Sequence, residues 1–128
     1  MPHRRAIEAD DAPSAVGNYA QAVALDAPAG WLIVSGQIPA DRDGAVPAGF
    51  GDQARLVWRN IEAQLRAGGM GLDDLVKVTI YLSDRIFADE NRAVRQEVLG
   101  QRRVALTCII TGIFDTAWLL EIEAIAAK

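Results

Sequence analysis

Residues 73–82 read Asp-Asp-Leu-Val-Lys-Val-Thr-Ile-Tyr-Leu and contain the clearest strand pattern of the chain. From Val76 onward, apolar side chains alternate with polar or aromatic ones without interruption. The apolar positions are Val76, Val78, Ile80 and Leu82, and the alternating ones are Lys77, Thr79 and Tyr81. Because successive side chains of a strand point to opposite faces, this pattern predicts a strand with one buried face.

Helical patterns flank this strand on both sides. The first begins at Asp52 and is predicted to end at Gly68 and Gly69. Its apolar arc consists of Ala54, Val57, Trp58, Ile61 and Leu65. The second follows a cap at residues 83–84 and runs to Leu99, with Gly100 in the position where glycine is preferred. Its expected inner stripe consists of Phe87, Asn91, Val94 and Val98.

Four further apolar runs predict strands, at residues 19–25, 31–35, 104–110 and 118–126. The turn-rich segment 26–30 predicts that the first two form an antiparallel pair. Residues 1–17 are expected to be an irregular lead-in. The order of elements predicts a single α+β domain over residues 1–128, with two helices on one face of a mixed β-sheet. The opposite, partly apolar face predicts burial against other subunits, and hence a homo-oligomer.

Composition excludes several classes of function. The 128 residues include 13 basic and 17 acidic side chains, a formal charge of −4, so nucleic acid is not an expected partner. One histidine, His3, and one cysteine, Cys108, are too few for a disulfide or a structural zinc site, and they disfavour a histidine-dependent nucleophile. No metal is expected. No apolar run approaches the roughly 18 residues of a membrane helix or follows Arg5 as a signal core, so the prediction is a cytoplasmic protein without membrane contact.

Four segments resemble the signature of the YjgF/RidA family: residues 18–23, 33–39, 73–82 and 121–126. They occur in the order and at the spacing typical of the family, from about Pro13 to the end of the chain. The resemblance implies a small cytosolic homotrimer with a chorismate-mutase-like fold and three clefts between neighbouring subunits. It also implies hydrolysis of the enamines and imines that pyridoxal-phosphate enzymes release, such as 2-aminoacrylate, to 2-ketoacids and ammonia. Family members need no metal or organic cofactor for this.

The resemblance also implies a set of cleft residues. The positions that match the family pattern are Tyr19, Ser35, Gly36, Gln37, Asn91, Cys108 and Glu121. Glu121 is the candidate catalytic residue, expected to hold a water molecule together with the backbone of residues 35–37, and the others are expected to bind substrate. The most important departure from the pattern is Leu106, which stands where active members carry an arginine that binds the substrate carboxylate. The proline pair before it is also absent, and Asn18 and Ala20 stand where a proline and a serine are usual. Leucine cannot donate the two parallel hydrogen bonds of a guanidinium group.

Two explanations of Leu106 remain open. Either Arg102 or Arg103 reaches into the cleft, or the ligand lacks a carboxylate and presents an apolar group to Leu106. The odd spacing between Arg103 and Leu106 favours the second, because it points the two side chains to opposite faces of a strand. The expected partner is a small imine, enamine or carbonyl compound. A non-catalytic member of the family that binds a metabolite or a partner protein is the alternative function, and a nuclease is a third.

Several candidates also have purely structural interpretations. The apolar run around Cys108 is typical of a buried, inert thiol, although its family position leaves reversible oxidation open. A buried Asn91 more often ties down a loop than contacts a ligand. Tyr19 is expected to be a wall of the cleft rather than an acid, and Glu123 to belong to a solvated strand face.

Overall fold

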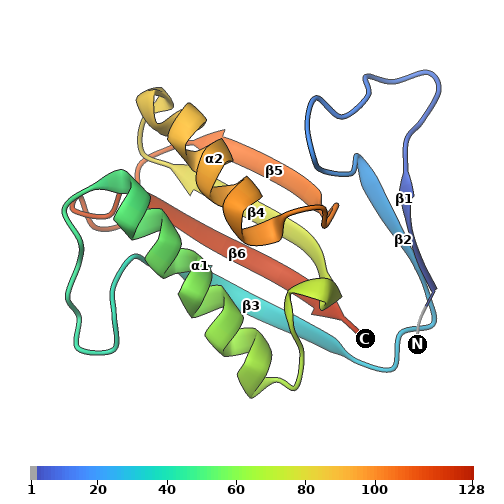
Figure 1. The fold of residues 1–128 in the computed structure, drawn as a ribbon, viewed down its shortest axis with the longest axis horizontal. Coiled ribbons are helices and arrows are strands. Elements are labelled where there is room, and N and C mark those ends of the chain that lie inside the picture. The colour runs from blue at the N-terminus through green and yellow to red at the C-terminus, as the bar shows by residue number, and fades with distance from the viewer. Residues whose placement is uncertain (1–2) are drawn as a thin grey trace.

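The computed structural model describes residues 3–128, and its main body is a four-stranded sheet with both helices on one face (Figure 1). The strand order is β3-β6-β4-β5. β4 and β5 are parallel and are connected through α2, whereas β6 pairs antiparallel with β3 and β4. The elements are β3 (Trp31–Gln37), α1 (Phe50–Ala67), β4 (Leu75–Leu82), α2 (Ala88–Leu99), β5 (Ala105–Ile110) and β6 (Leu120–Ala127). The expected α+β architecture with a mixed sheet is confirmed.

The core lies between this sheet and the two helices. All five residues of the apolar arc predicted for α1 are buried there, as are four alternate residues of β6, Leu120, Ile122, Ala124 and Ala126. In β4 the alternation changes at one point: Leu75 is fully buried and Val76 only partly. The register advances from Leu75 opposite Ala126 to Lys77 opposite Ile125, so β4 has one extra residue there. Such a bulge reverses the alternation and directs Leu75 into the core.

The second helix ends at Leu99 as expected, but its first turn is a 3-10 turn, α2 begins only at Ala88, and its buried stripe differs. The Asp84 side chain accepts a hydrogen bond from the Ile86 N–H, a short 3-10 turn at Arg85–Phe87 leads into α2, and Gly100 has a φ of 58°. The buried residues of α2 are Asn91, Val94, Arg95 and Leu99, whereas Val98 is only partly buried. A buried arginine is a rare choice for such a stripe, since charged side chains are seldom fully buried without a partner.

The N-terminal region corrects two expectations. β1 (His3–Ile7) pairs antiparallel with β2 (Ala22–Asp26), so residues 3–7 are not irregular; residues 1 and 2 lie outside the described part. The expected pairing of residues 19–25 with residues 31–35 is also wrong, because β3 pairs with β6 instead. In the connecting turn, the Ala29 and Gly30 N–H groups donate to the Lys128 carbonyl at 2.9 and 3.0 Å. The turn therefore directs the chain toward the end of β6 rather than back along β2.

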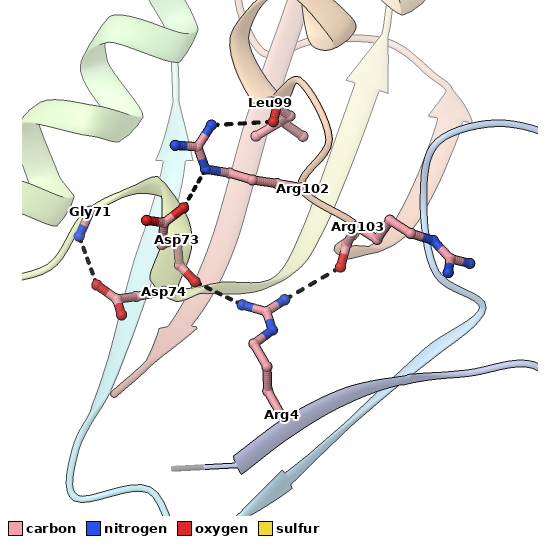
Figure 2. Close-up of polar contacts among 7 residues, drawn as sticks. All are labelled: Arg4, Gly71, Asp73, Asp74, Leu99, Arg102 and Arg103. Carbon is pink, nitrogen blue, oxygen red and sulfur yellow. Dashed lines mark hydrogen bonds and ion pairs between the residues drawn. The ribbon is translucent and has the colours of Figure 1, made fainter. Parts of the chain in front are cut away.

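Arginine side chains hold the two-stranded sheet against the main body (Figure 2). Arg4 of β1 donates to the Asp73 carbonyl at 2.8 Å and to the Arg103 carbonyl at 3.3 Å. Within the main body, Arg102 donates to the Asp73 carboxylate at 2.7 Å and so fixes the segment that Arg4 contacts. β1 reads His-Arg-Arg-Ala-Ile, and its contact with the main body is made by an arginine. The strand therefore lacks the apolar alternation from which a sequence predicts a strand. Within residues 3–128, no helix is both long and apolar enough to cross a membrane.

Gln53 is a buried polar side chain of α1 that fixes two loops. Its amide nitrogen donates to the carbonyls of Pro47 and Ala117 at 2.8 and 3.0 Å, and its amide oxygen accepts from the Leu119 N–H at 2.8 Å. A buried amide with three backbone partners is costly to remove, because each backbone group loses its hydrogen bond. Gln53 thereby sets the position of the segment that leads into β6.

Replacing Gln53 with leucine is expected to lower the free energy of unfolding by about 2–4 kcal/mol, because three buried polar groups lose their partner. Urea unfolding followed by circular dichroism measures this. The matched control is Gln64→Leu on the exposed side of the same helix, where the change is expected to stay within about 0.5 kcal/mol. Equal effects of the two substitutions would contradict the role assigned to Gln53.

Candidate functional site

The first part of the site lies on the open face of the sheet, opposite the helices. Between Val34 and Gln37, β3 has one residue more than β6, which places a bulge at residues 35–36. A Cβ atom at Gly36 would lie 1.9 Å from Oε2 of Glu121. The Glu121 carboxylate therefore rests directly on the Gly36 backbone, and any other residue at position 36 would displace it.

Two further polar groups accompany Glu121. Tyr81 of β4 lies opposite Glu121 in the strand register, and its hydroxyl donates to the Glu123 carboxylate. This hydrogen bond, burial and the negative charges of Glu123 and Glu121 raise the pKa of the Tyr81 phenol. Tyr81 is therefore a persistent hydrogen-bond donor, and Glu123 is a partner of the site rather than part of a solvated face.

These groups line a hollow of about 340 Å³, called the Glu121 hollow below. Its remaining wall is the segment before β6, in which Phe114 is 95% exposed. The lining residues are Gly36, Tyr81, Thr111, Gly112, Ile113, Phe114, Glu121 and Glu123. The hollow is open to solvent on the face of the sheet that no helix covers.

The second part of the site lies on the opposite side of the sheet, between α2 and the edge strand β5. The parallel register pairs Leu106 with Val78 and Cys108 with Ile80, so both side chains belong to the face that the helices cover. Leu106 packs against the core. Asn91 of α2 is 3% exposed, and its Oδ1 has no hydrogen-bond partner among the described residues. Its carboxamide oxygen therefore does not tie down a loop.

Tyr19 joins this second part through its backbone. The Arg103 guanidinium donates to the Tyr19 carbonyl at 3.2 and 3.3 Å, and the Ala20 N–H donates to the Val104 carbonyl at 2.8 Å. These bonds fix the segment before β2 alongside the beginning of β5. Tyr19 and Cys108 both lie close enough to Arg95 of α2 to influence the pKa of its guanidinium group. We call Tyr19, Asn91, Arg95, Leu106 and Cys108 the α2–β5 group.

Cys108 differs from its structural interpretation as a buried thiol, because its side chain is exposed at the sheet edge. Partial desolvation raises the pKa of the thiol, and the positive charge of Arg95 acts in the opposite direction. A thiol with a raised pKa is mostly protonated at neutral pH, so Cys108 is not a ready nucleophile.

Ser35 and Gln37 belong to neither part through their side chains. The Gln37 amide donates to the Ser35 carbonyl at 3.0 Å and accepts from Gln64 of α1 at 3.3 Å, on the helix side of β3. Both residues line a separate hollow of about 420 Å³. Within one chain, the predicted site residues are thus distributed over two faces of the sheet and do not form one cleft. No cluster of three or more potential metal ligands occurs in residues 3–128.

Known proteins share this sequence and fold. A family model described as endoribonuclease L-PSP matches residues 9–128. The 2-iminobutanoate/2-iminopropanoate deaminase of Escherichia coli K12 is 33% identical over 128 residues, which cover 97% of this chain and 98% of that protein. The chain belongs to the YjgF/RidA family.

Other relatives support the same placement. A RutC family protein of Pyrococcus horikoshii is 35% identical over 127 residues and covers 98% of each chain. The crystal structure of Escherichia coli TdcF with bound serine superposes with a TM-score of 0.71 at 32% identity, covering 97% of this chain and 98% of that one. The chorismate-mutase-like fold expected of a YjgF/RidA protein is therefore confirmed.

Arg95, Tyr81 and the wall at residues 111–114 were not expected in the site of this YjgF/RidA chain. Tyr81 lies on the predicted polar side of its strand, so strand alternation alone could have placed it beside Glu121. Arg95 had a weaker signal: it lies four residues after Asn91, and positions four apart share one face of a helix. Because a charged side chain is seldom buried, Arg95 was not assigned to the buried face of the helix together with Asn91.

The bond between Tyr81 and Glu123 can be tested by titration in a Tyr19→Phe variant, where Tyr81 is the only tyrosine because the chain has two. We expect Tyr81 to ionise above the ordinary tyrosine pKa, and Glu123→Gln to move the ionisation to lower pH by removing a negative charge. The bond stabilises the fold below the ordinary pKa, and this contribution is lost as the pH rises through the raised value. Phenolate absorbance reports the midpoint.

Glu62→Gln on α1 is the control for this titration, because Glu62 has no hydrogen bond or ion pair with any described residue. It is expected to leave the midpoint unchanged. An unchanged midpoint in Glu123→Gln as well would show that Tyr81 and Glu123 are not bonded.

Proposed function

We propose that this chain hydrolyses enamines and imines to carbonyl compounds and ammonia, without a cofactor, in clefts between the subunits of a homotrimer. The observation that carries the proposal is the Glu121 carboxylate, which lies on the backbone of Gly36 in an open hollow. Relatives named 2-iminobutanoate/2-iminopropanoate deaminases give the class of reaction. The acidic composition argues against the nuclease that the name of the family model suggests.

The residues of the Glu121 hollow fit the proton movements of this reaction. The oxygen of a water molecule adds to the carbon of the C=N bond, while a proton of that water passes to the Glu121 carboxylate, which then delivers it to the nitrogen. In the resulting carbinolamine, Glu121 moves the hydroxyl proton to the nitrogen in the same way. The C–N bond then breaks, ammonia leaves and the carbonyl group forms. The Tyr81 hydroxyl keeps its proton, donates it to the Glu123 carboxylate, and so fixes Glu123 in the same hollow as Glu121.

A cleft between copies would bring the two separated parts of the site together. The Glu121 hollow opens on the uncovered face of the sheet, whereas the α2–β5 group lies at the opposite side. Phe114, at 95% exposure, lines this hollow, and Ile33 of β3, at 69% exposure, is another exposed apolar side chain. Contact of this face with the β5 edge of another copy would cover them, and a head-to-tail contact of this kind closes into a ring.

The selectivity of the cleft is proposed to differ from that of relatives with an arginine at the position of Leu106. We do not expect Arg102 or Arg103 to replace that arginine, and Figure 2 shows Arg102 bonded to Asp73 and Leu99 instead. Arg102 is bonded to the Asp73 carboxylate and the Leu99 carbonyl, and Arg103 is bonded to the Glu8 carboxylate and the Tyr19 carbonyl. Leu106 would therefore present an apolar surface and favour substrates that carry an apolar group there.

Turnover tests the catalytic role of Glu121. Imines generated in solution by a pyridoxal-phosphate amino acid dehydratase would be followed by release of the ketoacid with and without the protein. Glu121→Gln is expected to lower the protein-dependent rate about 100-fold or more. Gly36→Ala is expected to lower it comparably while the fold is retained, because the new methyl group displaces only the end of a flexible side chain.

Gly30→Ala is the matched control, since no atom lies within 4 Å of the Cβ position there. It should keep wild-type turnover. Absence of any protein-dependent turnover, with ligand binding retained, would favour the non-catalytic binding function instead.

Leu106 is tested by comparing a short imine with one that carries a branched apolar side chain. Leu106→Ala is expected to reduce the preference for the branched imine about tenfold, because an apolar contact of a few methyl groups is lost. Leu106→Met, which conserves volume, should retain most of it. The measurement is the ratio of kcat/KM values. An equal ratio in all three proteins would show that Leu106 does not determine the substrate preference.

A further inference from the structure

We propose that Arg95 of α2 is the carboxylate-binding residue of this chain, in place of the arginine that the family resemblance implies at the position of Leu106. The identity of the ligand, a 2-imino or 2-enamino acid, rests on the proposed function. The presence of an anion-binding site at Arg95 rests on the structure alone.

Arg95 is a buried cation without a counterion. It is 7% exposed, and its guanidinium group makes no hydrogen bond or ion pair with any residue in 3–128. The acidic side chains of the same helix that form ion pairs do so elsewhere: Asp89 pairs with Arg92, and Glu97 with Arg55 of α1. The nitrogen atoms of this guanidinium are not fully enclosed, so an anionic ligand from outside the chain can reach its unused donors.

The charges around Arg95 favour the same conclusion. Three groups influence its charge state: Arg92, Cys108 and Tyr19. Arg92 is another cation, and Cys108 and Tyr19 are neutral in their protonated forms. Among residues 3–128, no carboxylate forms an ion pair with Arg95. Burial, the largest effect, and the neighbouring Arg92 both lower its pKa, yet an arginine remains charged at neutral pH.

Asn91 provides an independent second observation. It lies one helical turn before Arg95 on the same buried face of α2, and its Oδ1 has no hydrogen-bond partner in the described part of the chain either. An unused acceptor and an unused set of donors are therefore adjacent on the side of α2 that faces β5. Leu106 and Cys108 are on the facing side of that strand.

This pair matches the chemistry of one substrate class. A 2-imino or 2-enamino acid carries a carboxylate, which the Arg95 guanidinium can bind through two parallel hydrogen bonds, and a nearby N–H group, which can donate to Asn91. Its side chain would then contact Leu106. The carboxylate therefore remains part of the substrate, in contrast to the ligand without a carboxylate that Leu106 favoured from sequence alone.

The first experiment measures binding of 2-oxobutanoate and its neutral analogue 2-oxobutanamide by calorimetry. Wild type is expected to bind the acid at least about tenfold more tightly than the amide, and Arg95→Gln to lose this difference. Arg92→Gln, which removes a partly exposed cation from the same helix, is expected to retain it. Arg95→Lys should keep an intermediate preference, since it preserves the charge but not the paired donors.

The second experiment uses Cys108, the only cysteine, as a reporter beside Arg95. Its thiolate displaces iodide from iodoacetate or from neutral iodoacetamide, and the ratio of the two rates cancels any change in the fraction of thiolate. Relative to the unfolded chain, wild type is expected to favour iodoacetate several-fold, and Arg95→Gln to abolish this preference. An unchanged ratio in Arg95→Gln, together with unchanged binding of 2-oxobutanoate, would overturn the proposal.

Thermal unfolding separates a binding role from a structural one. Because Arg95 is an uncompensated buried charge, Arg95→Met is expected to raise Tm while carboxylate binding is lost. A lower Tm with unchanged binding would mean that Arg95 pairs with another copy, and this overturns the proposal. Loss of binding in Arg95→Gln without any turnover in wild type would leave the anion site standing and remove the proposed catalysis. Turnover that does not depend on Arg95 would support the proposed catalysis and overturn the proposed role of Arg95.

Discussion

The insertion of β6 between β3 and β4 is the pairing on which the rest of the structure depends. Ala124 lies opposite Val34 of β3 and also opposite Val78 of β4, so β6 connects two strands that would otherwise not meet. Its alternate residues supply the centre of the core beneath the helices. The residues between them, Glu121 and Glu123, are directed to the opposite face by the same alternation. One strand therefore both completes the core and carries the acidic groups of the candidate site.

Much of this arrangement follows from local patterns in the sequence. The period of α1 predicted its buried face, and the alternation of β4 predicted a strand with one covered side. Helix capping by Asp84 and the positive φ of Gly100 were also recognisable from residue type. Which strands pair with each other was harder to predict from the sequence. The turn at residues 26–30 has the composition of a hairpin, yet its backbone donors bind Lys128, a contact between distant parts of the chain.

The site shows the same distinction between local and distant information. The resemblance to the YjgF/RidA family identified Glu121 and Gly36 by position, and the structure places them in contact. It also directed attention to Leu106, because that position is where the expected arginine is missing. Comparing this sequence with the family pattern position by position cannot reveal that the guanidinium group of Arg95, which belongs to α2, lies near Leu106 of β5. The burial of Arg95 follows from how α2 lies on β5, which is a property of the packed molecule and not of either segment.

The distribution of polar groups over two faces of the sheet has a genetic consequence. In the proposed ring, each cleft takes Glu121 from one subunit and Arg95 from its neighbour. Two inactive alleles, one defective at each position, would then complement each other, because a mixed ring contains a cleft built from the two intact halves. A pair of defects at Glu121 and Gly36 belongs to the same half and would not.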